Sequence, residues 1–187
     1  FPTERMNKAI DRAIVYMAKT CERGVTFKTT DAAHPKLDYE VFSDSDWCTA
    51  HSTSGSCHLV RGRVVHASSK RQHSISLSST EAEIMAASLA AQEAIFHRSL
   101  FAEMGFDMSE PTVLWVDNMG AVECTQRRES LSRSRHIERR YLKILEWVAE
   151  GKIVVKYKNT KENHADMFTK PLESAVFDHH ASAIMGF

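Results

Sequence analysis

The order of strand-like and helix-like segments restricts this chain to few folds. Three β-rich segments come in succession, at about 37–45, 52–60 and 63–70, and the Arg61-Gly62 pair between the last two is typical of a hairpin turn. A long helical segment follows, and strands then alternate with helices. Hairpins give antiparallel pairs, whereas strand-helix-strand units give right-handed parallel crossovers. The order therefore predicts an α/β fold with a mixed sheet and helices on both faces.

The later segments alternate between strand-like and helix-like patterns of apolar residues. Strands are predicted at "TVLWVD" and "KIVVKYK", and a long helix is predicted between the candidate caps Ser78 to Thr80 and Gly105. The apolar stripe of that helix consists of Ala82, Met85, Ala86, Leu89, Phe96, Leu100 and Met104. Other helices are predicted at 4–23, 118–126, 135–150 and 162–169, with a loosely held helical tail at 173–187.

Composition excludes several classes of protein. The chain of 187 residues has 24 Lys plus Arg and 24 Asp plus Glu, so nucleic-acid binding would require local basic patches. Four scattered cysteines, without a CxxC pair or histidines at zinc-ligand spacing, indicate reduced intracellular thiols and argue against structural zinc. No long apolar run or signal peptide suggests a membrane. The start, without methionine and next to a helix, is what an excised piece of a longer polypeptide would show.

Acidic residues follow the predicted strands. "VFSDSDW" carries Asp44 and Asp46 at the end of an apolar run, Asp117 ends the strand "TVLWVD", and Asp166 comes shortly after the last strand. The carboxyl ends of parallel strands are where active sites gather in such sheets. A buried charge is costly unless it is neutralised, so these acids suggest a cation site.

Two glutamates complete the acidic set. Glu81 and Glu83 lie in the first turns of the long helix, which would pack across the sheet. Each acid alone has an ordinary reading, as a turn, a helix cap, a partner of the helix dipole or a surface residue. Together, oxygen ligands without cysteine or histidine suit Mg²⁺ or Mn²⁺ rather than zinc. Two such ions, about 4 Å apart, would hold the attacking and leaving oxygens of a phosphodiester.

The same residues carry a family resemblance. The segments "YEVFSDSDW", "STSGS", "SSKRQHSISLSSTEAEIMA", "VLWVDNMGAV", "SRSRHIERRY" and "ENHADMFTKPL" resemble, in order, the ribonuclease H domain of copia-type LTR retrotransposon polyproteins. The resemblance implies an RNase H-like fold, a five-stranded sheet of order 3-2-1-4-5, and a metal site of four acids binding two Mg²⁺ ions, with Mn²⁺ as an alternative. The implied catalytic and metal-binding residues are Asp44, Glu83, Asp117 and Asp166. Glu83 is chosen because it directly precedes the run Ile84-Met85-Ala86, and Glu81 is the runner-up.

The resemblance also implies a division of the chain. Residues 1–24 resemble the end of the reverse transcriptase region, 25–36 form a linker, 37–172 form the RNase H domain and 173–187 form a tail. The implied activity is hydrolysis of the RNA strand of RNA/DNA hybrids during reverse transcription, in an intracellular, cytoplasmic virus-like particle. The expected partners are the hybrid and the reverse transcriptase region of the same polyprotein, and no membrane.

One departure concerns proton transfer. Cellular enzymes of this superfamily carry a histidine on a mobile loop ahead of the last acid, whereas here the segment is short and His164 already lies inside a predicted helix. We therefore treat His164 as structural or solvated. Water, Asn163 or a neighbouring acid would then serve instead.

Polar residues near the predicted site could contact the hybrid without reading its sequence. The chosen substrate-binding residues are Ser68, Lys70, Gln72, Ser78, Ser79, Asn118, Arg135 and His136. The last two lie in the densest basic stretch of the chain, from Arg127 to Arg140, which resembles a family segment beside the hybrid. Loop, cap and solvated-face roles are the ordinary alternatives.

Two other functions compete with a ribonuclease. A degenerate domain could keep the fold as a nucleic-acid-binding module that supports the polymerase, although all four acids are present. A transposase or integrase on the same fold needs three acids, and neither "SSTEAE" nor "DMFTKPL" fits that class.

Overall fold

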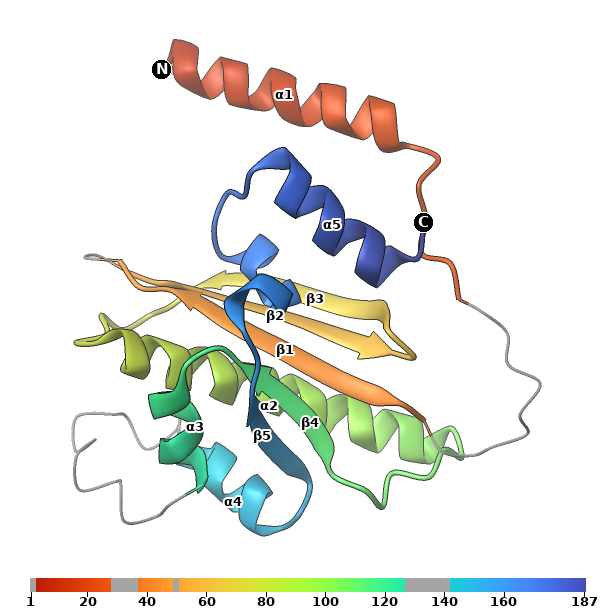
Figure 1. The fold of residues 1–187 in the computed structure, drawn as a ribbon, viewed down its shortest axis with the longest axis vertical. Coiled ribbons are helices and arrows are strands. Elements are labelled where there is room, and N and C mark those ends of the chain that lie inside the picture. The colour runs from red at the N-terminus through yellow and green to blue at the C-terminus, as the bar shows by residue number, and fades with distance from the viewer. Residues whose placement is uncertain (1–2, 28–36, 49–50, 127–141) are drawn as a thin grey trace.

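A five-stranded sheet organises the chain, as Figure 1 shows. The computed structural model describes residues 3–27, 37–48, 51–126 and 142–187. The strand order is β3-β2-β1-β4-β5, with antiparallel pairs at β3-β2-β1 and parallel pairs at β1-β4-β5. This confirms the predicted mixed sheet of order 3-2-1-4-5, which is the strand arrangement of an RNase H-like fold.

The antiparallel half is a three-stranded meander. It consists of β1 (Tyr39–Asp46), β2 (Thr53–Val60) and β3 (Arg63–Arg71). Arg61 and Gly62 both have positive φ, 52° and 71°, which is the geometry a tight hairpin turn requires. The hairpin predicted at this pair is confirmed.

The parallel half requires crossovers. The long helix α2 (Ser79–Glu103) leads from the meander to β4 (Thr112–Val116), and α3 (Met119–Gln126) and α4 (Lys143–Ala149) precede β5 (Ile153–Tyr157). Residues 135–141 of the helix predicted at 135–150 lie outside the described residues. Each parallel strand points its carboxyl end to the same edge of the sheet, where the predicted acids lie.

Helix α2 packs on the sheet through small side chains. Ala87, Ala90, Ala91 and Ala94 are buried in the main core with Val41 of β1. These alanines let the helix backbone approach the sheet closely. The predicted apolar stripe is wrong in its second half, because Phe96 and Met104 are 65% and 62% exposed and Leu100 is also exposed. The buried side of the helix follows the alanines instead.

The opposite face of the sheet is covered by the C-terminal segment. Two 3-10 turns, η3 (Thr160–Glu162) and η4 (His164–Phe168), replace the helix predicted at 162–169. Two asparagines cause this difference. Asn159 and Asn163 each accept a hydrogen bond from the backbone nitrogen two residues ahead, so each begins a separate short turn instead of one continuous helix.

Helix α5 (Ser174–Met185) corrects the prediction of a loosely held tail. Its residues His180, Ala181 and Ile184 are buried, and Ile184 shares a second apolar cluster with Phe42 and Leu59 of the sheet. The helix is therefore a layer of the fold, on the face opposite α2 (Figure 1).

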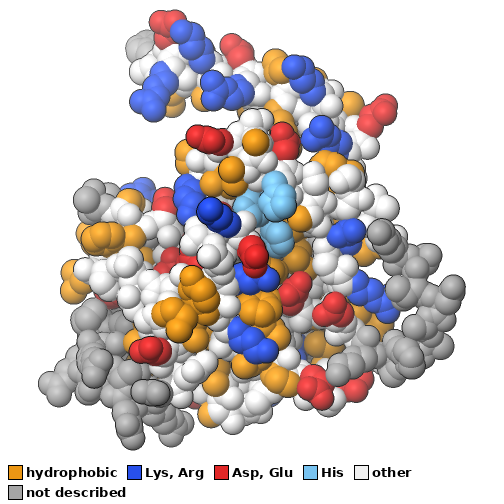
Figure 2. All heavy atoms as spheres, viewed as in Figure 1, with side chains coloured by type: hydrophobic (Ala, Val, Ile, Leu, Met, Phe, Trp, Pro, Cys, Tyr) orange, Lys and Arg blue, Asp and Glu red, His pale blue; other side chains and the backbone are white. Residues whose placement is uncertain are grey.

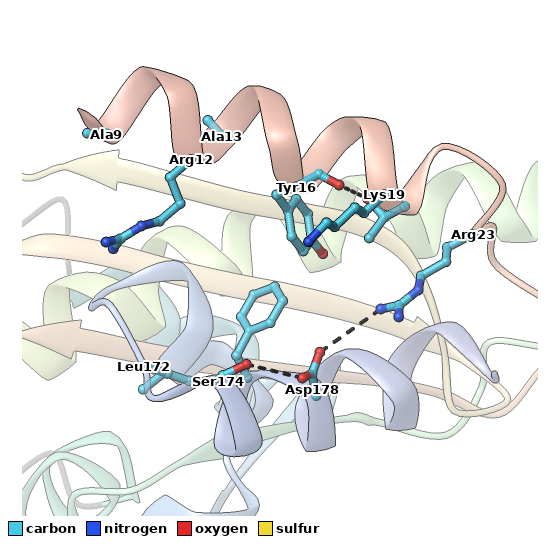
Figure 3. Close-up of a pocket in the computed structure, with 11 residues that line it drawn as sticks. Ala9, Arg12, Ala13, Tyr16, Lys19, Arg23, Leu172, Ser174 and Asp178 are labelled. Carbon is cyan, nitrogen blue, oxygen red and sulfur yellow. Dashed lines mark hydrogen bonds and ion pairs between the residues drawn. The ribbon is translucent and has the colours of Figure 1, made fainter. Parts of the chain in front are cut away.

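Helix α1 (Glu4–Thr20) lies beyond α5, with a groove between them (Figures 1 and 3). Its amphipathic period is as predicted, yet none of its residues is buried, and its Lys and Arg side chains line one edge of the surface in Figure 2. Tyr16 meets the Phe177 ring edge-on at 5.9 Å, and Thr26 donates a backbone hydrogen bond to Met185 at 2.8 Å. Among the described residues, no helix has the length and apolarity to cross a membrane.

Gly55 tests the packing of η4 on the sheet. A Cβ at this position would lie 2.6 Å from Cγ2 of Thr169 and 2.9 Å from the backbone oxygen of Ala165. We expect Gly55→Ala to lower the free energy of unfolding by about 1–3 kcal/mol in a urea titration. Gly24→Ala is the matched control, because no atom lies within 4 Å of the added Cβ, and it should change little. Equal stability of both variants with the wild type would contradict the close packing.

Candidate metal centre

Three aspartates from distant parts of the chain meet at the carboxyl edge of the parallel strands. Asp44 lies in β1, Asp117 directly follows the neighbouring strand β4, and Asp166 comes from η4. One carboxylate oxygen of each lies within 4.8 Å of the other two. Asp44 and Asp166 are buried, and Asp117 is partly buried.

The position of η4 depends on contacts with β1 and β2. Gly55 pairs with Asp44 across the sheet and leaves room for η4. The fully buried amide of Asn163 donates to the backbone oxygen of Ser43 at 2.9 Å and accepts from the nitrogen of Ala165 at 3.1 Å. The Thr169 hydroxyl donates to Asp44 Oδ2. These contacts bring Asp166 to the edge where Asp44 already lies.

The two candidate glutamates have different surroundings. Glu83 Oε1 accepts hydrogen bonds from the backbone nitrogen of Ser45 at 3.1 Å and its hydroxyl at 2.9 Å, while Oε2 is buried without a hydrogen-bond partner. Glu81 Oε2 instead accepts from the backbone nitrogen of Leu77 at 2.6 Å, as part of the N-terminal cap of α2. Glu81 thus has a capping role, whereas Glu83 has one free oxygen but is not among the three acids whose ligand atoms lie within 4.8 Å, so its place as the fourth acid stays a prediction.

Lys170 is the cation nearest to this cluster among the described residues. Its Nζ lies 3.1 Å from Asp166 Oδ2 and 3.7 Å from Asp44 Oδ2. Burial lowers the pKa of Lys170, but the charges of Asp44 and Asp166 outweigh burial and raise it. One ammonium group therefore partly balances several carboxylates.

The fold makes ionisation of the four acids less favourable. Burial is the main cause that raises the pKa of Asp44, Asp117 and Asp166. Burial, followed by the charges of Asp44 and Asp117, raises the pKa of Glu83 to about 8. Such crowding of carboxylates is costly without further positive charge.

The donors available fit a hard divalent cation. All are carboxylate oxygens, and two of them, Glu83 Oε2 and Asp166 Oδ1, are buried without a hydrogen-bond partner. Unpaired buried oxygens cost free energy unless something fills their coordination. Mg²⁺ and Mn²⁺ prefer such ligands, so the residues present fit the ions predicted from the sequence.

The predicted substrate-binding residues lie in several environments. Ser79 is exposed and Ser68 half-buried, whereas Ser78 caps α2 and Asn118 caps α3 through the nitrogen of Ala121 at 3.0 Å. Gln72 differs from the expectation, because its buried side chain donates to Ser54 and to the backbone of Ala82 and so fastens β2 to α2. Lys70 is exposed but paired with Glu93 at 2.9 Å. Arg135 and His136 lie outside the described residues.

His164 has the structural environment predicted for it. Its ring packs on Phe42 at 4.9 Å and its Nδ1 lies 3.0 Å from Nδ1 of His180, and burial lowers its pKa to about 4. The buried side-chain amide of Asn163 makes two hydrogen bonds. It therefore anchors η4 and is not free to transfer protons.

Sequence reasoning missed Ser45, Thr169 and Lys170 as members of the site. A signal for the last two was present, because they follow Asp166 by three and four residues and would share its side of a helical turn. Ser45 gave no signal, since it contacts Glu83 only through the tertiary fold.

Glu83→Gln tests the crowding of charge through stability. In the metal-free protein the Glu83 carboxyl has a pKa of about 8 instead of the ordinary 4.5, so the folded state holds this proton more tightly than the unfolded state. The protonated Glu83 carboxyl stabilises the folded state fully below pH 4.5, and this stabilisation is lost as the pH rises to about 8. We expect Glu83→Gln to melt above the wild type at pH 8 with chelator, and not at pH 4. A lower melting temperature at pH 8 would contradict this.

Comparison with known proteins identifies the family of this chain. The chain is 32% identical to the retrovirus-related Pol polyprotein from transposon RE1 of Arabidopsis thaliana over 98% of its length, covering 12% of that protein. It is 30% identical to the corresponding RE2 polyprotein over 98% of its length, covering 13% of that protein. It is 32% identical over 75% of its length to the polyprotein from transposon TNT 1-94 of Nicotiana tabacum, covering 10% of it. The chain thus spans about an eighth of the first two relatives, and no protein-family model matches it.

Solved structures give weaker likenesses. The N-terminal RNase H domain of a Mycobacterium tuberculosis protein has a TM-score of 0.48 and 13% identity, over 79% of this chain and 96% of that one. RNase H1 of Halobacterium salinarum has a TM-score of 0.41 and 16% identity, over 70% and 93%. The assignment therefore depends on the sequence match and the observed strand order. The chain is an RNase H-like domain that matches copia-type retrotransposon Pol polyproteins over nearly its whole length.

Proposed function

We propose that this chain is a metal-dependent endoribonuclease that cuts the RNA strand of RNA/DNA hybrids and leaves a 3′-hydroxyl and a 5′-phosphate. The observation that carries the proposal is the buried meeting of Asp44, Asp117 and Asp166 at the carboxyl edge of the sheet, with the unpaired Glu83 Oε2 from α2. Because this set offers only carboxylate oxygens, it suits two Mg²⁺ ions or Mn²⁺.

The four acids would share one role, and neighbouring side chains orient them. Asp44, Glu83, Asp117 and Asp166 would hold the ions, and bound ions would supply activation of a water and stabilisation of the leaving oxygen. Ser45 fixes one oxygen of Glu83 and leaves the other buried and free to bind an ion. Thr169 orients Asp44, and Thr160 donates to Asp117 Oδ2 at 2.8 Å. Hydroxyl donors thus fix the carboxylates of Asp44, Glu83 and Asp117 without any cation.

The hybrid would be read by its shape and its 2′-hydroxyls rather than by its sequence. Ser79 and the half-buried Ser68 and Asn118 are the contacts we favour among the described residues. Arg135 and His136 are proposed for the phosphates on their sequence alone. In the parent polyprotein the domain would act beside the reverse transcriptase region, with α1 as its boundary helix, and remove genomic RNA inside a cytoplasmic virus-like particle.

The first test is cleavage of a labelled hybrid by the whole chain. We expect Asp44→Asn and Asp117→Asn to lower the rate by about 10²-fold or more, because lost metal binding removes several kcal/mol of transition-state stabilisation. Asp46→Asn is the matched control, since Asp46 lies two residues along β1 and binds Thr53 outside the cluster. Chelator should abolish cleavage by the wild type.

Other outcomes would assign other functions. An equal, metal-independent signal from the wild type and both variants, together with hybrid binding, would support a degenerate binding module. Cleavage of duplex DNA but not of the hybrid would favour a transposase or integrase. Either result would overturn the proposed ribonuclease.

Lys170 supplies a second test. Its ammonium lies beside Asp44 and Asp166 and would repel an incoming cation. We expect Lys170→Met to lower the Mg²⁺ concentration for half-maximal cleavage roughly tenfold, which corresponds to about 1.4 kcal/mol and is within reach of one nearby charge. Lys152→Met is the control. Lys152 directly precedes β5, at the end of the strand away from the acidic edge, and pairs with Glu150. An unchanged or higher Mg²⁺ requirement in Lys170→Met would contradict this role.

A further inference from the structure

A second cluster of metal-ligating side chains lies between α2 and the antiparallel half of the sheet. His58 of β2 and His66 of β3 are direct partners in the strand register, so their side chains lie on the same face of the sheet. Glu93 and His97 lie one turn apart on α2 and therefore share one side of that helix. The three imidazole rings have centroids 4.9 to 5.2 Å apart.

The ligand atoms converge on one point. Glu93 Oε2 lies 3.2 Å from His58 Nε2 and 3.6 Å from His66 Nε2, and one ligand atom of each of the three residues lies within 4.8 Å of the other two. In a tetrahedral site with bonds of about 2.0–2.1 Å, ligand atoms are about 3.3 Å apart. The two separations from Glu93 Oε2 are close to this value.

His58 and Glu93 are already hydrogen-bonded to each other, and two further features point to a ligand at this cluster. His66 Nε2 is buried without a hydrogen-bond partner, although it faces the cluster. His58 is completely buried, and its Nδ1 lies 2.7 Å from Tyr39 Oη. A metal on Nε2 leaves the proton on Nδ1, and Tyr39 Oη is placed to accept a hydrogen bond from this N–H group. Such outer partners fix the tautomer and orientation of metal-binding histidines.

We propose that His58, His66 and Glu93 form a site for a zinc-class divalent ion that ties the β2-β3 hairpin to α2. Two imidazoles and one carboxylate are a common zinc ligand set, with a fourth position left for water. Lys70 binds Glu93 Oε1 at 2.9 Å, and the Ser56 hydroxyl donates to Oε2 at 2.9 Å, so both oxygens are held in place and Oε2 would bind the ion while it keeps the Ser56 contact. Cysteine spacing argued against zinc, but these ligands are separated by 8 and 27 residues and meet only in the fold. The site is separate from the acidic centre and does not depend on the proposed nuclease activity.

The experiment measures Zn²⁺ binding by equilibrium dialysis, and Co²⁺ binding by visible absorption, with excess Mg²⁺ to occupy the acidic centre. We expect one ion per chain and a rise in melting temperature with Zn²⁺. His66→Ala should weaken binding tenfold or more and remove the melting shift. Glu93→Gln, which keeps the size of the side chain, should do the same and serves if His66→Ala fails to fold by circular dichroism.

Two controls locate the binding. His73→Ala removes an exposed histidine outside the cluster and should bind like the wild type. Asp44→Asn should also bind Zn²⁺ like the wild type, because the acidic centre is a different site. The proposal is overturned if the wild type binds no ion, if folded His66→Ala and Glu93→Gln bind unchanged, or if Asp44→Asn abolishes binding.

Discussion

Mutual repulsion among buried carboxylates governs this structure. Asp44, Asp117 and Asp166 are brought within 4.8 Å, the charges of Asp44 and Asp117 also act on Glu83 of α2, and Lys170 is their nearest cation among the described residues. Burial raises the pKa of each of these acids, so folding without metal costs free energy at this edge. The fold bears that cost because the rest of the sheet is closely packed. A divalent cation would relieve it, which links metal binding to stability as well as to chemistry.

A few contacts between η4 and the sheet hold the acids together. Gly55 gives η4 room to lie on β2, Asn163 binds η4 to the backbone of β1, and Thr169 bonds to Asp44 directly. A change in any of these contacts would move Asp166 relative to the strands. The small alanines of α2 serve the other face in the same way, because they let the helix approach closely enough for Glu83 to reach Ser45. Both layers are therefore needed to assemble one site.

Much of this arrangement could be predicted from the sequence. The β-rich runs, the Arg61-Gly62 turn and the strand-helix alternation determine the sheet, and acids at strand ends indicate its functional edge. Periodicity misled where small residues decided the packing, so Phe96 and Met104 were assigned to a buried stripe that the alanines occupy. The turns at 160–168 were missed because two Asn caps override an apparently helical segment. Ser45 and the His58-His66-Glu93 cluster depend on contacts that only the folded chain creates, whereas Lys170 could be inferred from its spacing of four residues from Asp166.

The most direct test of the central claim is a crystal structure of the chain grown with Mn²⁺, with the ions located by anomalous scattering. Our account requires Mn²⁺ between the carboxylates of Asp44, Glu83, Asp117 and Asp166, with the ammonium of Lys170 displaced from Asp166. Density for Mn²⁺ only at other sites, with the Lys170 ion pair intact, would contradict it.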